Sequence, residues 1–290
     1  MGKQIVLTAF LFSVAAFGQA PAHISIAGRD VALWRPAGPP PTPSGFPVIV
    51  FSHGFSGCHT QSVFLMQALA SEGYFVLAPN HRDARCGTAR QSQWSARDWR
   101  PEEPFQKPSA WTDATYRDRA NDIRAVLDAV LRAPSFEGVR VDPKRVGVAG
   151  HSLGGYTVLG LAGAWPSWKD DRIRAVLALS PYTNPYLGIG DLGGMDVPVM
   201  YQGGTVDLGI TPSVKRVNGA YDRSSAPKYF VEFKGAGHFA WTDLNARYQK
   251  VIGQYSVAFF DQYLKGRDSL TSLTETPWPA EVKIVRESVK

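Results

Sequence analysis

The 290-residue sequence has few cysteines, few charged residues and no internal repeat. Its two cysteines and its lack of a Cys-x-x-Cys pair argue against a zinc cluster. Charged residues make up 19% of the chain, and the net charge of +6 comes from basic residues that are scattered among acidic ones. We therefore expect no nucleic-acid partner, because such a partner usually requires a clustered basic patch.

Only one long apolar run is present, and it lies near the N-terminus. Lys3 precedes the apolar residues 5–17, and small residues follow up to Ala20. The run is too short to span a bilayer, and this order of features is typical of a secretory signal peptide. A buried N-terminal helix is the alternative, but the run lacks an amphipathic stripe. We predict cleavage after Ala20, a secreted or periplasmic location without a membrane span, and one domain over residues 21–290.

The rest of the chain alternates between strand-like and helix-like segments. Residues 22–36 predict an antiparallel hairpin, and apolar runs bounded by Pro or Gly predict strands that are buried on both faces. The expected strands cover residues 46–54, 74–81, 144–150, 173–180, 197–204 and 228–235, and the expected helices cover 60–72, 115–133, 153–165 and 248–266. This alternation predicts an α/β fold whose mostly parallel sheet carries helices on both faces.

The segment GHSLG at residues 150–154 fits the Gly-x-Ser-x-Gly elbow, in which a strand turns sharply into a helix. Gly150 and Gly154 would remove side chains that collide in such a turn, and Ser152 would be held in a strained, exposed position. Ser152 could instead only cap the helix, but a cap needs no flanking glycines. The strand before it and the helix after it favour a nucleophile.

A serine nucleophile needs a base within hydrogen-bond reach and an acid that orients the base. In folds that carry this elbow, the acid and then the histidine follow the serine along the chain. His238 follows Ser152 directly after an expected strand, and Asp207 follows the strand before it. A solvated loop histidine is the alternative for His238. Asp191 and Asp196 are competing acids, but both precede that strand and are better explained as loop residues.

Acyl transfer also requires backbone N–H groups that stabilise the oxyanion of the tetrahedral intermediate. The residue after the nucleophile, Leu153, supplies the first donor. The loop SHGFSG at residues 52–57 follows the first parallel strand, and we assign the second donor to Phe55, whose ring would line the acyl pocket. The alternative for this loop is a glycine turn that only closes the strand.

The motifs VIVFSHGFSG, GHSLGG, GGTVDLGITP and GAGHF together resemble the serine esterase branch of the α/β-hydrolase superfamily. More narrowly, they are similar to cutinase-like polyester hydrolases and to dienelactone-hydrolase-like and platelet-activating-factor-acetylhydrolase-like proteins. The resemblance covers most of residues 46–265. It implies the nucleophile, acid, base and oxyanion donors that are named above, with no metal and no cofactor.

The chain also departs from these families. Dienelactone hydrolases use a cysteine nucleophile, and Ser152 excludes that chemistry here. Cutinase-like enzymes often carry a tyrosine where this chain has Phe55, and a tryptophan near the segment that this chain fills with residues 180–188. Tyr182 and Tyr186 are the candidates for the missing aromatic wall of the substrate pocket.

Residues 82–114 form a long connection after a central strand, and we expect it to overhang the pocket of Ser152 as a cap. Trp94, Trp99 and Trp111 would offer apolar surface to a substrate, or would only pin the connection to the core.

The two cysteines, Cys58 and Cys86, follow neighbouring expected strands. In an exported protein such a pair is expected to form a disulfide, which would link the oxyanion loop to the cap.

These features together predict a secreted serine carboxylic ester hydrolase that acts on apolar or aromatic esters, including polyesters, as a monomer. The alternatives are an acetylhydrolase of short-chain lipid esters, a serine peptidase or amidase, an acyltransferase and a non-catalytic binding protein. The complete set of serine, acid, base and oxyanion loop argues against the last. Polyester, short-chain lipid ester and phthalate-like ester all fit the sequence.

Overall fold

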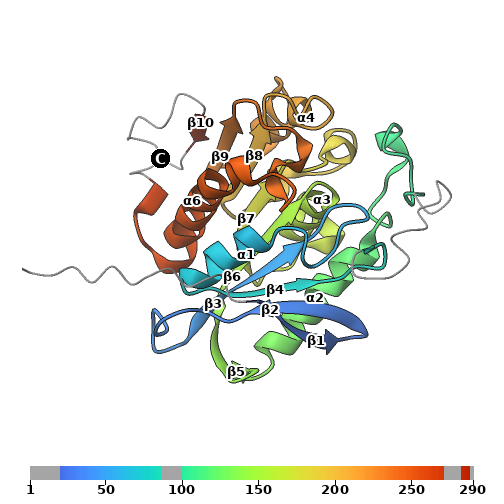
Figure 1. Cartoon of the computed structure of the whole chain (residues 1–290). Helices are drawn as coiled ribbons and strands as arrows, with labels where there is room; N and C mark the ends of the chain where they lie inside the picture. The colour runs from blue at the N-terminus through green and yellow to red at the C-terminus, as the bar shows by residue number, and fades with distance from the viewer. Residues whose placement is uncertain (1–19, 86–99, 271–281, 288–290) are drawn as a thin grey trace, which may run out of the picture.

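The computed structural model describes residues 20–85, 100–270 and 282–287. In these residues the strands form one sheet in the order β1-β2-β4-β3-β6-β7-β8-β9-β10, and the short β5 pairs with β6 (Figure 1). The strands are β1 (Ala22–Ile26), β2 (Arg29–Trp34), β3 (Phe46–Ser52), β4 (Phe75–Pro79), β5 (Ser135–Phe136), β6 (Val139–His151), β7 (Ile173–Leu179), β8 (Val199–Gly204), β9 (Lys228–Phe233) and β10 (Val282–Glu287).

The middle of the sheet is parallel and its edges are antiparallel. All pairs from β4 through β3, β6, β7 and β8 to β9 are parallel. The expected hairpin of β1 and β2 joins β4 in antiparallel register, and β10 joins β9 in the same way at the other edge. The mostly parallel sheet that the sequence predicts is therefore confirmed.

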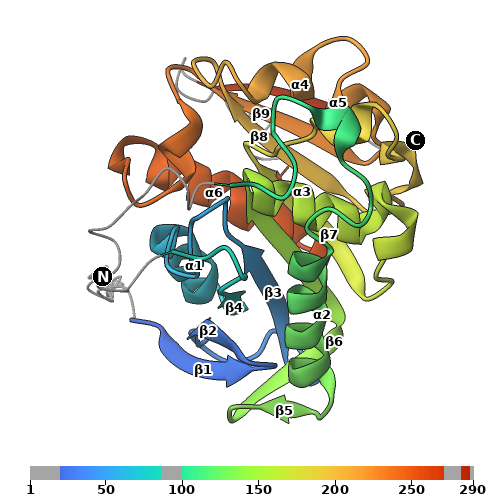
Figure 2. The same ribbon diagram turned by 90° about the vertical axis from the view of Figure 1, so that its right-hand side faces the viewer.

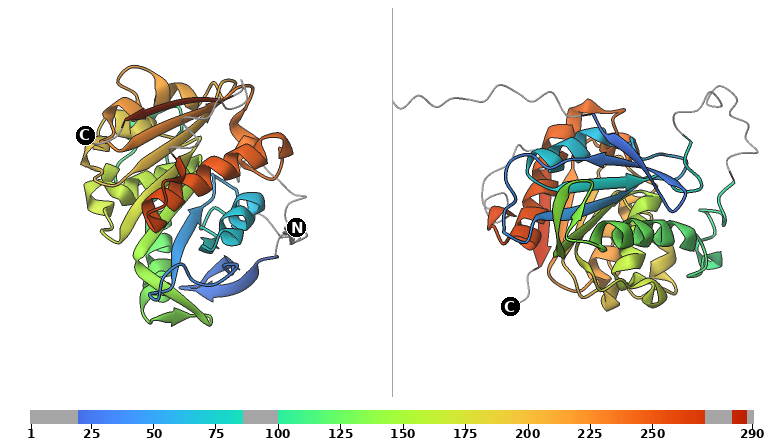
Figure 3. Two further views of the ribbon diagram at one scale, coloured as in Figure 1. Left: turned by 90° about the vertical axis from the view of Figure 1, so that its left-hand side faces the viewer. Right: turned by 90° about the horizontal axis from the view of Figure 1, so that it is seen from below.

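Helices cover both faces of the sheet, as Figure 2 shows. They are α1 (Val63–Ser71), α2 (Arg117–Leu131), α3 (Leu153–Leu159), α4 (Thr211–Lys215), α5 (Ala220–Arg223) and α6 (Gln249–Phe260). Helices α1 and α6 run side by side on one face (Figure 3), and α2 and α3 pack on the other. Because side chains of a strand alternate between faces, Val48 and Val50 join one core and Ile49 and Phe51 the other.

The carboxyl ends of the parallel strands meet at one edge of the sheet and position the polar residues that follow them. Ser152 comes directly after β6 and Ser180 directly after β7. Asp207 follows β8, and His238 follows β9. Ligands of open α/β sheets bind at this edge, so these four side chains come from the part of the fold where a site is expected.

Some elements differ from their predicted form. The helix expected over residues 153–165 is α-helical only to Leu159 and continues as a wider turn to Ala164, where Gly163 adopts a φ of 123°. Strand β10 was not predicted. Val282 and Ile284 of this edge strand pack on the core, and an alternation of two apolar residues is too short to indicate a strand. Among the described residues, no helix has the length and apolar character needed to cross a membrane.

Candidate active site

Ser152 lies in a strained turn between β6 and α3. Its φ of 55° and ψ of −116° fall in a region that side chains rarely adopt. A Cβ atom on Gly154 would lie 1.9 Å from the backbone oxygen of Ser52, and one on Gly150 would lie 2.2 Å from the backbone oxygen of Gly154. Close backbone approach therefore requires both glycines, as the sequence predicts for an elbow.

The structure brings Ser152, His238 and Asp207 together in that order. Ser152 Oγ lies 3.0 Å from His238 Nε2, and His238 Nδ1 lies 3.3 Å from Asp207 Oδ1. Asp207 is 4% exposed, whereas the side chain of His238 is 28% exposed. The carboxylate is thus shielded behind an imidazole whose other nitrogen faces the serine.

Two hydroxyl groups that the sequence reasoning missed hold the carboxylate of Asp207. Ser180 Oγ donates to Asp207 Oδ2 and also lies 2.9 Å from His238 Nδ1, and Thr211 Oγ1 donates to the same carboxylate oxygen at 3.2 Å. Burial by itself would raise the pKa of Asp207, but the hydrogen bonds from His238 and Ser180 lower it below its usual value. The carboxylate therefore stays charged. Ser180 directly follows the buried strand β7, and this position in the sequence is the feature from which its place in the site could have been predicted.

His151 connects the loop of the base with the loop after β3. Burial, together with the nearby His238, lowers the pKa of His151 to about 3, so its ring is neutral. His151 Nε2 donates to the backbone oxygen of His238 at 2.9 Å, and Nδ1 accepts from Gln61 Nε2 at 3.0 Å. Gln61 Oε1 in turn accepts the backbone N–H of Gly54 at 2.9 Å. This chain of hydrogen bonds fixes the spacing between the two loops.

The loop after β3 passes beside Ser152. A Cβ atom on Gly54 would lie 3.4 Å from the Cβ atom of Ser152, so the backbone here runs close to the serine. Phe55 follows in the same loop and lines the cavity that contains Ser152. Leu153 is the first residue of α3, and N–H groups in the first turn of a helix have no acceptor within that helix. The two residues to which the oxyanion donors are assigned thus belong to segments beside Ser152.

A buried ion pair holds this loop from behind. Arg119 is 0% exposed and donates to the backbone oxygen of His53 and, at 2.6 Å, to Asp83 Oδ1. Asp83 Oδ2 accepts the backbone N–H of Ser56 at 3.0 Å. The pair thus contacts the chain on both sides of Phe55. The sequence reasoning missed both residues, because an arginine on a helix and an aspartate in a loop carry no recognisable pattern.

The cavity in front of Ser152 has a volume of about 1010 Å³ and is largely apolar in its lining. Its apolar side chains come from the loop after β3, the segment before α2 and the loops after β7, β8 and β9. They are Phe55, Phe105, Tyr182, Ile210, Phe239 and Leu244. Because Phe105 and Gln106 belong to the expected cap, the described part of that segment does reach the pocket.

The family model described as "Alpha/beta hydrolase family" matches residues 49–284, which is most of the chain. The chain belongs to the α/β-hydrolase family. The match starts in β3 and reaches β10, so it includes every element that contributes to the site described above.

Curated relatives of this α/β-hydrolase include cutinases. Cutinase 1 of Thermobifida cellulosilytica is 32% identical over 149 residues, which cover 50% of this chain and 52% of that protein. Cutinase 2 of the same organism is 26% identical over 219 residues, 74% of this chain and 68% of that protein. A platelet-activating factor acetylhydrolase of Cavia porcellus is 25% identical over 249 residues, which cover 77% of this chain and 54% of that protein. The chain thus spans about half to two thirds of the length of these relatives.

The aromatic candidates of this α/β-hydrolase divide into two groups. Tyr182 lines the cavity, and its hydroxyl donates to the backbone oxygen of Phe105 at 2.6 Å. Trp111 and Tyr186 are 0% exposed and do not line it, so the expectation that they contact a substrate is corrected. The ring of Trp111 packs among Phe105, Tyr182 and neighbouring rings and pins the segment to the core. Tyr186 stacks on another buried tyrosine ring.

Three further predicted residues fall outside the described part of the chain. They are Trp94, Trp99 and Cys86. The contribution of the two tryptophans to the pocket and the disulfide of Cys86 with Cys58 therefore stay predictions. The competing acids are placed in loops: Asp191 Oδ1 accepts the backbone N–H of Gly194 at 2.9 Å, and Asp196 pairs with Lys169 at 2.9 Å.

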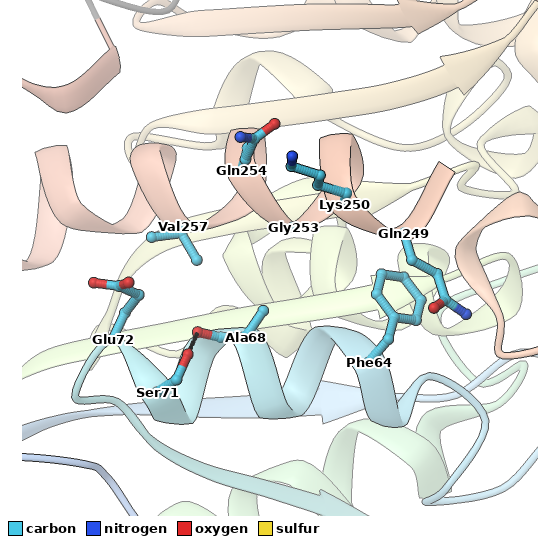
Figure 4. A pocket seen from close by; sticks show the side chains of 9 residues that line it. All are labelled: Phe64, Ala68, Ser71, Glu72, Gln249, Lys250, Gly253, Gln254 and Val257. Carbon is cyan, nitrogen blue, oxygen red and sulfur yellow. Dashed lines mark hydrogen bonds between the residues drawn. The ribbon is translucent and has the colours of Figure 1, made fainter. Parts of the chain in front are cut away.

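A second cavity, of about 400 Å³, lies between α1 and α6 (Figure 4). Its lining is Phe64, Ala68, Ser71, Glu72, Gln249, Lys250, Gly253, Gln254 and Val257. The hydroxyl of Ser71 donates to the backbone oxygen of Ala68 at 2.8 Å, and none of the described residues that line this cavity is a histidine. It therefore offers no activated nucleophile, and the cavity at Ser152 is the candidate active site.

Proposed function

We propose that this α/β-hydrolase is a serine carboxylic ester hydrolase that works through an acyl-serine intermediate. One observation carries the proposal: Ser152, held at a positive φ, has its Oγ 3.0 Å from a histidine nitrogen whose other nitrogen faces the buried Asp207. A serine hydroxyl becomes a useful nucleophile in this arrangement. The similarity to cutinases supports an ester as the substrate.

In the proposed reaction, Ser152 Oγ forms a bond to the carbonyl carbon of the ester while His238 Nε2 takes the hydroxyl proton. The carbonyl π electrons move to the oxygen, and the N–H groups of Phe55 and Leu153 stabilise that oxyanion. Asp207 stabilises the imidazolium. When the carbonyl re-forms, the alcohol leaves with the proton from His238. Water, activated by the same nitrogen, then releases the acid from Ser152. The mechanism requires neither metal nor cofactor.

The substrate class that we propose is an apolar or aromatic ester, with polyester chains as the extended case. Four exposed apolar side chains come from the two loops that carry the acid and the base, and we call this set the apolar rim. It consists of Val206 (56% exposed), Leu208 (77%), Phe239 (60%) and Leu244 (82%). Phe239 and Leu244 also line the cavity, so the apolar rim begins at its mouth. The match to an acetylhydrolase favours short-chain lipid esters as the second candidate.

We also propose that the protein is exported as a monomer after cleavage behind Ala20. The basic, apolar and small-residue order of the first 20 residues supports export, as does the pair of cysteines, which would be oxidised outside the cytosol.

The direct test of the activity is the substitution Ser152→Ala. We expect it to lower kcat for p-nitrophenyl butyrate at least about 10³-fold, because the acyl-enzyme can no longer form. Ser71→Ala is the matched control, since that hydroxyl lies in the cavity between α1 and α6 and should have no effect. A fluorophosphonate probe should label the wild type at Ser152. Full activity of Ser152→Ala would rule the mechanism out.

A panel of p-nitrophenyl esters from acetate to palmitate, together with a polyester film, tests the substrate class. Release of soluble products from the film would support polyester hydrolysis. Activity confined to acetate and butyrate, with an untouched film, would favour the short-chain lipid esters instead.

A further inference from the structure

Two histidines and an aspartate from three different segments meet near β1 at the edge of the sheet, away from the serine. His23 lies in β1, Asp30 in β2, and His59 in the loop after β3. His59 Nε2 lies 2.9 Å from Asp30 Oδ2, and His23 Nδ1 lies 3.3 Å from Asp30 Oδ1. The ligand atoms of all three side chains lie within 4.8 Å of one another. The proposed ester hydrolysis uses none of them.

The backbone holds these residues in place through Asn80. The backbone N–H of Asn80 donates to the backbone oxygen of Asp30 at 2.8 Å, and Asn80 Oδ1 accepts the backbone N–H of His59 at 2.9 Å. His23 and Asp30 belong to the paired strands β1 and β2, so their separation is fixed by the sheet register. Pre-positioned ligands of this kind lose little conformational entropy when a ligand binds.

The residue types of the cluster suit a metal ion. Imidazole nitrogens and carboxylate oxygens are common zinc ligands. His59 is 7% exposed, whereas the side chains of His23 and Asp30 are about half-exposed. The cluster is therefore anchored on its buried side and open to solvent on the other, so an ion can enter it.

We propose that His23, Asp30 and His59 bind one zinc ion, with water in the fourth position. Two ligands of a tetrahedral zinc, at about 2.0–2.1 Å from the ion, lie roughly 3.4 Å apart. The two histidine nitrogens lie 3.3 and 2.9 Å from different oxygens of Asp30, so a small turn of the side chains would bring one carboxylate oxygen and both nitrogens around one ion. His23 is half-exposed and can rotate to complete the site. Bound zinc would tie the edge hairpin to the loop that also carries Phe55. The low cysteine count argues only against a cysteine zinc cluster, and the proposed ester hydrolysis needs no metal, so a zinc ion bound by these three residues would have a structural role.

The test uses the full chain without a histidine tag, treated with EDTA and then dialysed. Isothermal titration with zinc chloride should give one saturable site. Thermal unfolding should show a Tm that is higher by about 5 °C when zinc exceeds its Kd about 100-fold. Calcium, which prefers sites with more oxygen ligands, should not raise the Tm. Cobalt should bind in the same place and give the visible absorption of a tetrahedral ion.

Variants decide where the metal binds. The side chains of His23 and Asp30 are half-exposed, so His23→Ala and Asp30→Asn should leave the fold intact. Each substitution should lower zinc affinity more than about tenfold. His238→Ala is the control, because the histidine beside Ser152 could also attract zinc, and here the titration should be unchanged. The proposal fails if wild-type protein shows neither heat nor a Tm shift. It also fails if His238→Ala abolishes binding, or if His23→Ala and Asp30→Asn leave it unaltered. None of these readouts depends on ester hydrolysis.

Discussion

At the scale of single residues, the pair of Asp83 and Arg119 shows how one buried charge depends on another. Burial by itself would raise the pKa of Asp83, but the charge of Arg119, with further hydrogen bonding, lowers it to about 2 from an ordinary value of 3.8. The unfolded chain therefore binds a proton at a higher pH than the folded chain does. The stability that this ionisation contributes is present above about pH 4 and is lost as the pH falls towards 2.

Asp83→Asn should therefore destabilise the protein most at neutral pH. Removing one partner of a buried ion pair costs about 3–5 kcal/mol of unfolding free energy. Because the wild type loses its own contribution in acid, we expect the difference between wild type and variant to shrink by about 1.5 kcal/mol between pH 6 and pH 2.5. Urea unfolding over this range measures both values. Asp128→Asn is the control: its side chain is 61% exposed, and its effect should stay below about 1 kcal/mol throughout. A difference that is constant with pH would contradict the argument.

Residues of the site differed in how far the sequence revealed them. The meeting of Ser152, Asp207 and His238 could be predicted because each follows a buried parallel strand, and such strands end at one edge of the sheet. Ser180 has the same kind of position but no motif around it. Arg119 could not be predicted, since its contacts with the loop after β3 depend on how α2 packs against that strand.

At the scale of elements, the loop after β3 is the part of the site that most needs support. Oxyanion donors act only when they are aimed at the place where charge develops. The fork of Arg119 contacts His53 and Asp83 at once, and Asp83 extends this hold to Ser56. The proposed donor Phe55 lies between these anchors. The geometry of the loop therefore depends on a guanidinium group that never reaches the cavity.

Arg119→Lys should loosen this loop, because a single ammonium group cannot reproduce the planar fork. We expect kcat for p-nitrophenyl butyrate to fall about tenfold with little change in KM, since the oxyanion exists only in the transition state. The rate of fluorophosphonate labelling of Ser152 should fall in parallel. Arg124→Lys, whose guanidinium contacts the backbone of Trp168 away from the cavity, is the control. A lower Tm with an unchanged kcat would mean that Arg119 supports only the fold.

Elements were predictable where local pattern and burial agree. A continuous apolar run indicates a strand buried on both faces, and the strand expected over residues 46–54 appears as β3. An amphipathic stripe indicates a helix packed on one side, and the helix expected over 115–133 appears as α2. The short α4 and α5 were not predicted, because each spans little more than a helical turn and lacks a complete apolar stripe.

At the scale of the whole molecule, the surface around the cavity combines two properties. The chain carries a net charge of +6, yet the apolar rim exposes uncharged side chains next to the acid and the base. Leu208 lies between Asp207 and Gly209, and Gly209 lines the cavity. An apolar polymer that settles on the rim would therefore bring its ester groups to the mouth of the cavity. Such contact is driven by burial of apolar surface and does not depend on charge.

Leu208→Ser tests this contact, because Leu208 is 77% exposed and does not line the cavity. Burying one leucine side chain contributes about 1.5–3 kcal/mol, so we expect adsorption to a polyester film and release of products from it to fall at least about tenfold. Hydrolysis of p-nitrophenyl butyrate should stay the same, since a soluble ester needs no rim. Val217→Ser is the matched control: its side chain is 82% exposed, but it lies outside the rim. Wild-type adsorption should also persist in about 1 M salt, where charges are screened within about 3 Å. If salt releases the protein while Leu208→Ser still adsorbs fully, charge rather than the rim holds it to the film.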